Sequence, residues 1–419
     1  MKSPNVKCIT TNSGRTRFNP NIYNEGKVCL SILGTWRGEP GEQWSSAQGL
    51  ESILLSIQSL MSSNPYENEP GFENTKKDKP QAEEYAKKIK HETLRIAVIQ
   101  RMEGLMGMDS GSASHKNSTL FKDVKNKSKG SASSKNMSEP EEEEHLFGAG
   151  SSASSADSSV YEYNPDADLE DEGVWDPFAD LIKRRFLWYY DTYAQGIEAA
   201  AKEVTDGQAF PRAEFEYPPN SMEGHYDYKG LRKRLDRIAQ ALEQEKVAWE
   251  KAGAAQVESG AQLANQLAFQ FKQLEHTWNK SDYAGSRVEV SLPNPNNPFT
   301  WHLTLFGAPM TNLDGGIFNM SLAIPPNFPD AQPRLQIHTP IFHHRVSSKG
   351  YLCYFPTKRD EIGSHLSAIK AAIEGEVEPK FDPRAVLDPE AFALFWGGPE
   401  KRKVYSRRLR RSAQESCEY

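Results

Sequence analysis

The chain has 419 residues, of which 37% are hydrophobic and 26% are charged, and this length allows two to three domains with sizeable cores. Fifty Lys and Arg residues against 57 Asp and Glu residues give a net charge of −7. This balance argues against nucleic-acid binding, because neutralising phosphates requires a surplus of cations. No stretch approaches the roughly 20 apolar residues of a membrane span, and the start of the chain lacks the apolar core of a signal peptide. Four cysteines are too few for a disulfide framework, so we expect a protein of a reducing compartment that binds neither nucleic acid nor membrane.

Apolar residues recur at helical spacing in five segments. In the first segment the following residues predict one buried helix face: Ile53, Leu54, Ile57, Leu60 and Met61. The same spacing predicts helices over residues 82–106, from Pro177 onwards, around 231–242 and around 263–278. Proline suits the first turn of a helix, which supports the start of the third helix at Pro177.

After the fifth helix, apolar residues alternate with polar ones, as in strands that bury one face. Four such runs are separated by turns rich in Gly and Pro, at residues 288–292, 301–305, 318–324 and 335–337. The sequence therefore predicts an α+β fold, in which a helix precedes an antiparallel four-strand meander. Flanking helices are expected to cover the apolar face of the meander.

The second notable feature of the chain is an internal repeat. Two pairs of segments match when the chain is laid on itself, namely 4–11 with 333–340 and 18–29 with 342–353. Gly26 then falls on Gly350, and Cys29 on Cys353. Two of the four cysteines therefore occupy equivalent positions.

The chemical role of Cys29 has two interpretations. A free cysteine is most often a small buried hydrophobe. Near Cys29, however, Gly26 permits a tight turn, and the amide of Asn21 could donate a hydrogen bond to a developing oxyanion. These neighbours favour a nucleophilic thiol. No histidine lies near it in the first copy, so a papain-like Cys/His pair has no local support.

The run NPNIYNEGKVCLSIL around Cys29 resembles the active-site signature of ubiquitin-conjugating enzymes, in which H-P-N precedes the catalytic cysteine. Further downstream segments resemble the Z-type members of that family, namely CLSILGTW, SIQSLM, NPYENEPGFE and HETLRIAV. The runs FLWYYDTY and HYDYKGLRKRL resemble the C-terminal extension of that type. The resemblance covers most of residues 4–107 and 175–245.

This resemblance implies an enzyme that accepts ubiquitin, or a ubiquitin-like protein, as a thioester on Cys29 from an activating enzyme and transfers it to a substrate lysine. A ubiquitin ligase is the expected further partner, and no metal or cofactor is implied. By the same resemblance, Asn21 organises the active-site loop and stabilises the oxyanion, and Asn19 has a structural role. Asn68 and Glu69 lie near the position of the acidic residue that helps the incoming lysine.

The second copy resembles the same fold over its whole length. In it, His343, His344 and Arg345 stand where H-P-N is expected. Cys353 is thus a candidate catalytic residue, although the loss of the Asn favours a degenerate, binding-only domain. The two histidines beside Cys353 do not form a recognised metal pattern.

The first copy has the opposite defect, because the helix and three strands that precede the matching point in the second copy, roughly 70 residues, have no counterpart before it. Two accounts remain: a chain that is a fragment, which we favour, or a first domain completed by another part of the chain. An alternative function follows, a noncatalytic adaptor of the ubiquitin pathway.

Taken together, the patterns divide the chain into four parts. Residues 1–107 form the C-terminal part of a conjugating domain, 108–172 a disordered Ser/Gly/acidic linker, 173–250 a helical extension and 258–415 a second conjugating-enzyme-like domain. The basic run at 401–411 is typical of a solvated helix face, and a nuclear-import signal is the alternative. We therefore expect a cytoplasmic location and leave the nucleus open.

Overall fold

The computed structural model describes residues 2–38, 41–77, 79–108, 176–217, 221–279, 287–375 and 386–418. Its first and middle parts contain the following elements: η1 (Ser31–Leu33), α1 (Leu50–Leu60), η2 (Pro65–Asn68), α2 (Pro80–Glu92), η3 (Thr93–Gln100), α3 (Arg101–Leu105), α4 (Ala179–Ala200) and α5 (Tyr228–Glu258). The remaining elements are α6 (Gln262–Asn279), β1 (Arg287–Ser291), β2 (Thr300–Phe306), β3 (Ile317–Ala323), β4 (Arg334–Ile337), α7 (Ile362–Glu374), α8 (Pro389–Trp396), α9 (Pro399–Glu415) and η5 (Ser416–Glu418). Among the described residues, no helix is both long enough and apolar enough to cross a membrane.

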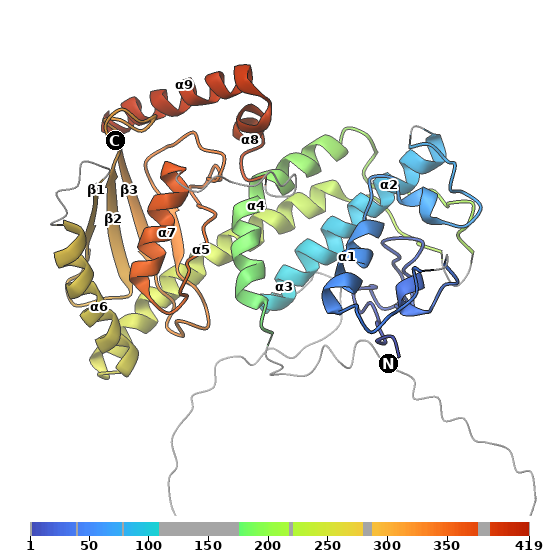
Figure 1. The fold of residues 1–419 in the computed structure, drawn as a ribbon, viewed down its shortest axis with the longest axis horizontal. Helices are drawn as coiled ribbons and strands as arrows, with labels where there is room; N and C mark the ends of the chain where they lie inside the picture. The colour runs from blue at the N-terminus through green and yellow to red at the C-terminus, as the bar shows by residue number, and fades with distance from the viewer. Residues whose placement is uncertain are drawn as a thin grey trace, which may run out of the picture. The chain divides into compact units, whose positions relative to one another are not determined.

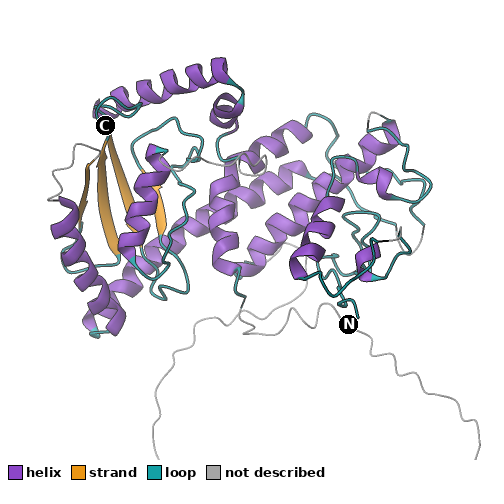
Figure 2. Ribbon diagram, viewed as in Figure 1, coloured by secondary structure: helices purple, strands orange, loops and turns teal. Residues whose placement is uncertain are grey.

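The four strands form one antiparallel sheet in the order β1-β2-β3-β4, which confirms the predicted meander (Figure 2). Leu303 of β2 lies opposite Val290 on one side and Met320 on the other, so buried residues of neighbouring strands share a face. Figure 1 shows α7 lying across the sheet and α6 beside its β1 edge. Phe271 of α6 meets Trp301 edge-on, with 5.0 Å between ring centroids. The sheet therefore has the helical cover that its alternating pattern requires.

The helix predicted over residues 82–106 is present as three consecutive elements, α2, η3 and α3, and the hydrogen bonds of η3 follow the wider π-helical spacing. Buried ion pairs tie this helix to the extension. The Lys88 ammonium lies 2.6 Å from Glu216, and both side chains are at most 1% exposed. The carboxylate of Glu103, also 1% exposed, lies 2.6 Å from Arg234 of α5. The long helix of the first copy is thus held to the extension by these two ion pairs.

The predicted extension consists of α4 and α5, which pack together through a core that includes Phe186, Leu235 and Ile238. Helix α5 continues to Glu258, past the expected boundary at residue 250, so the extension reaches the expected start of the second copy at residue 258. Most of the predicted linker at 108–172 lies outside the described residues.

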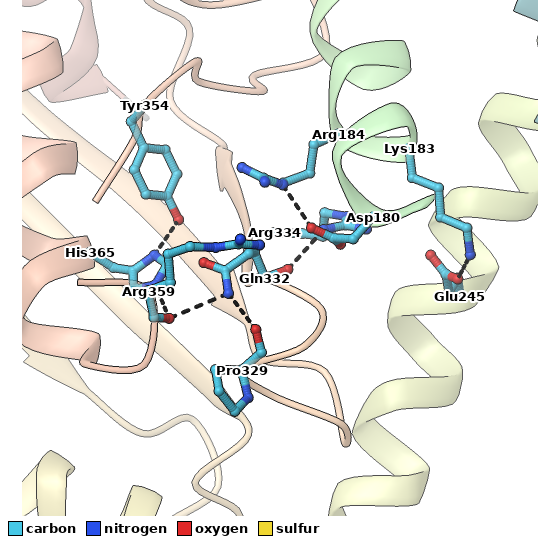
Figure 3. Close-up of polar contacts among 10 residues, drawn as sticks. All are labelled: Asp180, Lys183, Arg184, Glu245, Pro329, Gln332, Arg334, Tyr354, Arg359 and His365. Carbon is cyan, nitrogen blue, oxygen red and sulfur yellow. Dashed lines mark hydrogen bonds and ion pairs between the residues drawn. The ribbon is translucent and has the colours of Figure 1, made fainter. Parts of the chain in front are cut away.

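One ion pair joins the extension to the second copy, and further polar contacts lie near it within the extension (Figure 3). Asp180 of α4 accepts hydrogen bonds from Arg184 at 2.9 Å and from Arg334 of β4 at 2.7 Å. Lys183 of α4 lies 2.5 Å from Glu245 of α5. Because the side chain of Arg334 is only 3% exposed, its pairing with Asp180 balances a buried charge at this contact.

The predicted buried face of α1 is wrong in part. Ile53 is 1% exposed, as expected, but Leu54 is 57% exposed and Met61 is 50% exposed. Ile53 joins only a small cluster with Val28, Ile32 and Leu33. The physical reason is the lack of a cover, because residues 2–108, as far as they are described, form isolated bridges and no strand. The helix is correctly predicted, but its face at Leu54 and Met61 is left exposed by the described chain.

Candidate functional site

The backbone around Cys29 has the same hydrogen bonds as the backbone around Cys353, which supports the repeat found in the sequence. Each cysteine N–H donates to the carbonyl eight residues before it, Asn21 at 2.8 Å in the first copy and Arg345 at 2.9 Å in the second. Two further backbone bonds recur. The N–H of Cys8 donates to the carbonyl of Gly26, as that of Ile337 does to Gly350, both at 2.8 Å. The N–H of Gly26 donates to the carbonyl of Tyr23, as that of Gly350 does to Ser347, both at 2.9 Å. The two loops therefore have the same path.

Glycine is required at the turn in both copies. Gly26 has φ +90° and Gly350 has φ +80°, values that other residues rarely adopt. A Cβ atom on Gly26 would lie 2.2 Å from the carbonyl oxygen of Cys8, and one on Gly350 would lie 2.0 Å from that of Ile337. The equivalence of the two glycines thus reflects one tight turn used twice.

Two asparagines hold the loop that carries Cys29. Asn21 Nδ2 donates to the carbonyl oxygen of Cys29 at 3.1 Å. Asn19 is fully buried; its Nδ2 donates to the carbonyl of Leu60 at the end of α1 at 2.8 Å, and its Oδ1 accepts from Asn21 N–H at 2.9 Å. The structural role expected of Asn19 is therefore visible in its contacts. Asn21 lies next to Cys29 and organises the loop, while its oxyanion role stays a prediction.

Tyr23 is a further member of this site that the sequence reasoning missed. A hydrogen bond with Cys29, together with burial, raises the pKa of Tyr23. The guanidinium of Arg17 lies 5.3 Å from the centre of the Tyr23 ring, and Lys27 Nζ lies 5.4 Å from it. Its place in the tight turn, four residues after Asn19, is the one signal that could have indicated it.

Glu69 lies close to this group, as expected from the resemblance. Its carboxylate is 3.7 Å from Arg17, and its charge contributes to the raised pKa of Tyr23. Burial raises the pKa of Glu69 itself, against the opposing effect of Arg17. Asn68 instead donates to the carbonyl of Leu60 at 3.1 Å, so it supports the end of α1. Cys29, Tyr23, Arg17 and Glu69 form one cluster, which we call the Cys29 site.

Cys353 has different surroundings in spite of its identical loop. Burial raises the pKa of its thiol to about 11, and nearby arginines, Arg345 first, only partly oppose this effect. Helix α4 covers this side of the second copy, where Trp188 meets Phe355 edge-on at 5.5 Å. Arg345 occupies the place of Asn21 but its side chain forms no hydrogen bond to the cysteine carbonyl. These surroundings favour a neutral thiol at Cys353.

The two histidines beside Cys353 are core residues. His343 is 2% exposed and His344 is 6% exposed, and burial lowers their pKa values to about 3 and about 2. His344 stacks on Phe395 with 3.7 Å between ring centroids. Within the described ranges, no group of three or more His, Cys, Asp or Glu side chains is placed to hold a metal ion.

Comparison with known proteins finds similarity in two regions of the chain, one around each cysteine loop. The model of the ubiquitin-conjugating enzyme family matches residues 1–93 and 270–356. Ubiquitin-conjugating enzyme E2 Z of Xenopus tropicalis is 54% identical over 101 residues, which are 24% of this chain and 31% of the relative. The human E2 Z has the same identity over 101 residues, or 27% of its length. The human dual E2 ubiquitin-conjugating enzyme/E3 ubiquitin-protein ligase BIRC6 is 41% identical over 104 residues, which are 24% of this chain and 2% of that protein.

The identity to E2 Z falls on about the first hundred residues, which contain the Cys29 site. The chain spans less than a third of the length of these relatives. The two matched regions contain the two cysteine loops with the same hydrogen bonds and the same glycine turn. Residues 1–93 and 270–356 of this chain are therefore similar to the ubiquitin-conjugating enzyme family.

Proposed function

We propose that the first copy carries ubiquitin, or a ubiquitin-like protein, as a thioester on Cys29 and transfers it to a lysine of a protein substrate. The observation that carries the proposal is the Cys29 loop, which Asn21 holds by its side chain in the region most similar to E2 Z. An activating enzyme, a ubiquitin ligase and a substrate protein are the partners that this function requires.

The chemistry consists of two acyl transfers. In the first, the Cys29 thiolate attacks the thioester carbonyl between the modifier and the activating enzyme, and the cysteine of that enzyme leaves as a thiolate. In the second, a lysine amine attacks the carbonyl bound to Cys29, loses a proton, and the Cys29 thiolate leaves.

Asn21 and Glu69 have separate roles in this scheme. The amide nitrogen of Asn21 carries two hydrogens, of which one bonds the Cys29 carbonyl. The second hydrogen can meet the oxyanion that forms as the carbonyl is attacked. The raised pKa of Glu69 and its contact with Arg17 in the Cys29 site support a role in taking up the proton that the amine loses.

A charging assay tests this proposal. The full chain is incubated with activating enzyme, ATP and ubiquitin, and the products are separated with and without a thiol reductant. We expect a reductant-sensitive adduct that Cys29→Ala abolishes and Cys353→Ala retains. An adduct that survives Cys29→Ala would overturn the assignment of the nucleophile.

A second assay tests Asn21. Transfer from the charged chain to free lysine should slow by about 100-fold in Asn21→Ala, since a single oxyanion donor contributes this much in other acyl transfers. Asn24→Ala, in the same loop, is the matched control and should transfer at the normal rate, because the side-chain amide of Asn24 donates to the carbonyl of Gly14 at 3.1 Å.

The alternative is a noncatalytic adaptor that binds ubiquitin-pathway partners. It is favoured by the uncovered face of α1, where Leu50, Leu54 and Leu55 are each more than half exposed, and by the neutral thiol of Cys353. An adaptor would bind charged activating enzyme or ubiquitin but form no thioester, so a chain that charges fully rules the adaptor out.

A further inference from the structure

Arg17 is a buried cation in the Cys29 site, and neither acyl transfer described above uses it. Only 4% of the residue is exposed. Its Nη2 donates to the carbonyl of Pro20 at 2.6 Å, and its Nε donates to the carbonyl of Ile22 at 3.4 Å. These two residues lie on either side of Asn21, whose side chain bonds the carbonyl of Cys29. One guanidinium therefore holds the backbone on both sides of the residue proposed to meet the oxyanion.

The same guanidinium reaches two further side chains of the site. Its Nη2 lies 3.7 Å from the carboxylate of Glu69, which is the proposed proton acceptor. Its Cζ lies 5.3 Å from the centre of the Tyr23 ring, and Tyr23 forms a hydrogen bond with Cys29. A planar guanidinium can bind several acceptors at fixed angles, whereas a lysine ammonium acts as a point charge. Arg17 thus contacts the surroundings of the oxyanion, the proton acceptor and the thiol at once.

The helical extension contributes to this arrangement through Met222. The backbone N–H of Arg17 donates to the sulfur of Met222 at 3.2 Å, and Met222 is 4% exposed. Met222 belongs to the same apolar cluster as Tyr66 of η2. The carbonyl of Tyr66 in turn accepts from the backbone N–H of Glu69 at 3.3 Å. One residue of the extension is therefore linked both to Arg17 and to the turn that carries Glu69.

Comparison with the second copy separates a role in the chemistry from a role in shaping the loop. The repeat places Ile341 at the position of Arg17 and Ser347 at the position of Tyr23. The second loop nevertheless has the same backbone hydrogen bonds and the same glycine turn. Because this path forms without a guanidinium, Arg17 is not needed to shape the loop. Burying its charge costs free energy, and the side chains that it holds in the first copy account for that cost.

We propose that Arg17 is a positioning residue for the transfer to lysine and that Met222 of the extension holds it in place. This inference rests on the function proposed above. In the transfer, the lysine amine attacks the thioester carbonyl on Cys29, its proton passes to Glu69, and the Cys29 thiolate leaves. Arg17 acts through Glu69, which receives the proton, and through Asn21, which meets the oxyanion. The extension thereby takes part in the chemistry of the first copy.

Arg17 also affects the charge of Glu69. Burial raises the pKa of Glu69 and Arg17 opposes this effect, so loss of the guanidinium should raise that pKa further. Only ionised Glu69 accepts a proton, so the acid limb of the transfer rate should then move to higher pH. The charge of Glu69 also acts on Tyr23 and Tyr85. A hydrogen bond with Cys29 raises the pKa of Tyr23, and burial raises that of Tyr85, so both stay neutral below about pH 9 and do not cause the shift.

Transfer from the charged full chain to free lysine, measured in a single turnover between about pH 5 and pH 9, tests this role. Arg17→Ile introduces the residue of the second copy. We expect it to slow transfer about tenfold and to move the acid limb to higher pH. Arg17→Lys keeps the charge but has no planar fork of donors, so it should slow transfer about threefold and leave the acid limb in place. Arg15→Ile, at an exposed arginine two residues earlier, is the matched control and should change neither quantity.

Rates are taken per charged chain and relative to the unaltered chain, so the ionisation of free lysine cancels. A rate of Arg17→Ile within about twofold of the unaltered chain, or a slower rate with an unmoved acid limb, would overturn the positioning role and leave the proposed function standing. A folded Arg17→Ile chain that does not charge would contradict a role in the second transfer. An unaltered chain that does not charge would refute the proposed function and this inference with it.

Two more variants complete the test. If Arg17→Ile does not fold, Arg17→Gln also removes the charge and is judged by the same rate and the same acid limb. Met222→Ala leaves Arg17 unchanged but removes its sulfur contact, so transfer should slow severalfold. A normal transfer rate in a folded Met222→Ala chain would contradict the part assigned to the extension.

Discussion

Helices α1 and α7 follow the two cysteine loops and have the same apolar pattern, yet they differ in burial. Both have apolar residues at positions i, i+4, i+7 and i+11, starting at Leu50 in α1 and at Ile362 in α7. In α7, Ile362 is 0% exposed and Leu366 is 1% exposed, because the helix lies against the sheet. In α1, Leu50 and Leu54 are 68% and 57% exposed. The pattern therefore predicts an apolar face but not the presence of its partner.

The two cysteine loops, which precede these helices, have the same backbone but different side-chain surroundings. Their backbones agree bond by bond, but the side chains around the two thiols differ. In the first copy a hydrogen bond with Cys29 raises the pKa of Tyr23, whereas in the second copy burial raises the pKa of Cys353. By exposed area the order is reversed, because Cys29 is 5% exposed and Cys353 is partly exposed. The two thiols therefore differ in the side chains around them and in the raised pKa of Cys353, and not in a greater exposure of Cys29.

The largest expected effect concerns the buried ion pair between the first copy and the extension. Lys88→Ala leaves Glu216 as a buried, uncompensated charge, so the free energy of unfolding should fall by about 4 kcal/mol. Urea unfolding followed by circular dichroism measures this loss. Lys90→Ala, on the exposed side of the same helix, is the control and should cost less than about 0.5 kcal/mol. A mild effect of Lys88→Ala would mean that the extension does not anchor the first copy.

The second effect compares α1 and α7 directly. Leu366→Ala should reduce the free energy of unfolding by about 3 kcal/mol, since it opens a cavity in the core under the sheet. The matching change Leu54→Ala removes an exposed side chain and should cost less than about 0.5 kcal/mol. Equal costs at the two positions, in the same urea experiment, would show that the face of α1 is covered.

A smaller effect is expected at the Cys29 site. Tyr23→Phe removes the hydroxyl that bonds the sulfur while keeping the ring, so alkylation of Cys29 at pH 8 should slow severalfold. Peptide-resolved mass spectrometry measures the rate at each cysteine separately. Tyr217→Phe, at a tyrosine that is 66% exposed, should leave the rate unchanged. A faster reaction in Tyr23→Phe would mean that the hydroxyl shields Cys29 instead of activating it.

Much of this architecture could be predicted from the sequence because it depends on local patterns. Alternation at period two predicted the meander, and the repeat of Gly26 and Gly350 predicted the shared turn. The exposure of Leu54 could not be predicted, because burial depends on which other segment is present to pack against it. The Cys29 to Tyr23 bond and the burial of Cys353 under α4 depend on tertiary contacts that no local pattern encodes.

The most direct test of the account measures both thiols in one sample. The full chain is treated with iodoacetamide at pH 8, and the modification of Cys29 and Cys353 is followed by peptide-resolved mass spectrometry, with the exposed Cys417 as the internal reference. With a pKa of about 11, only about one Cys353 thiol in a thousand is ionised at pH 8. Although Cys29 is only 5% exposed and Cys353 is partly exposed, the account predicts that Cys29 reacts faster than Cys353, and equal or faster reaction of Cys353 would contradict it.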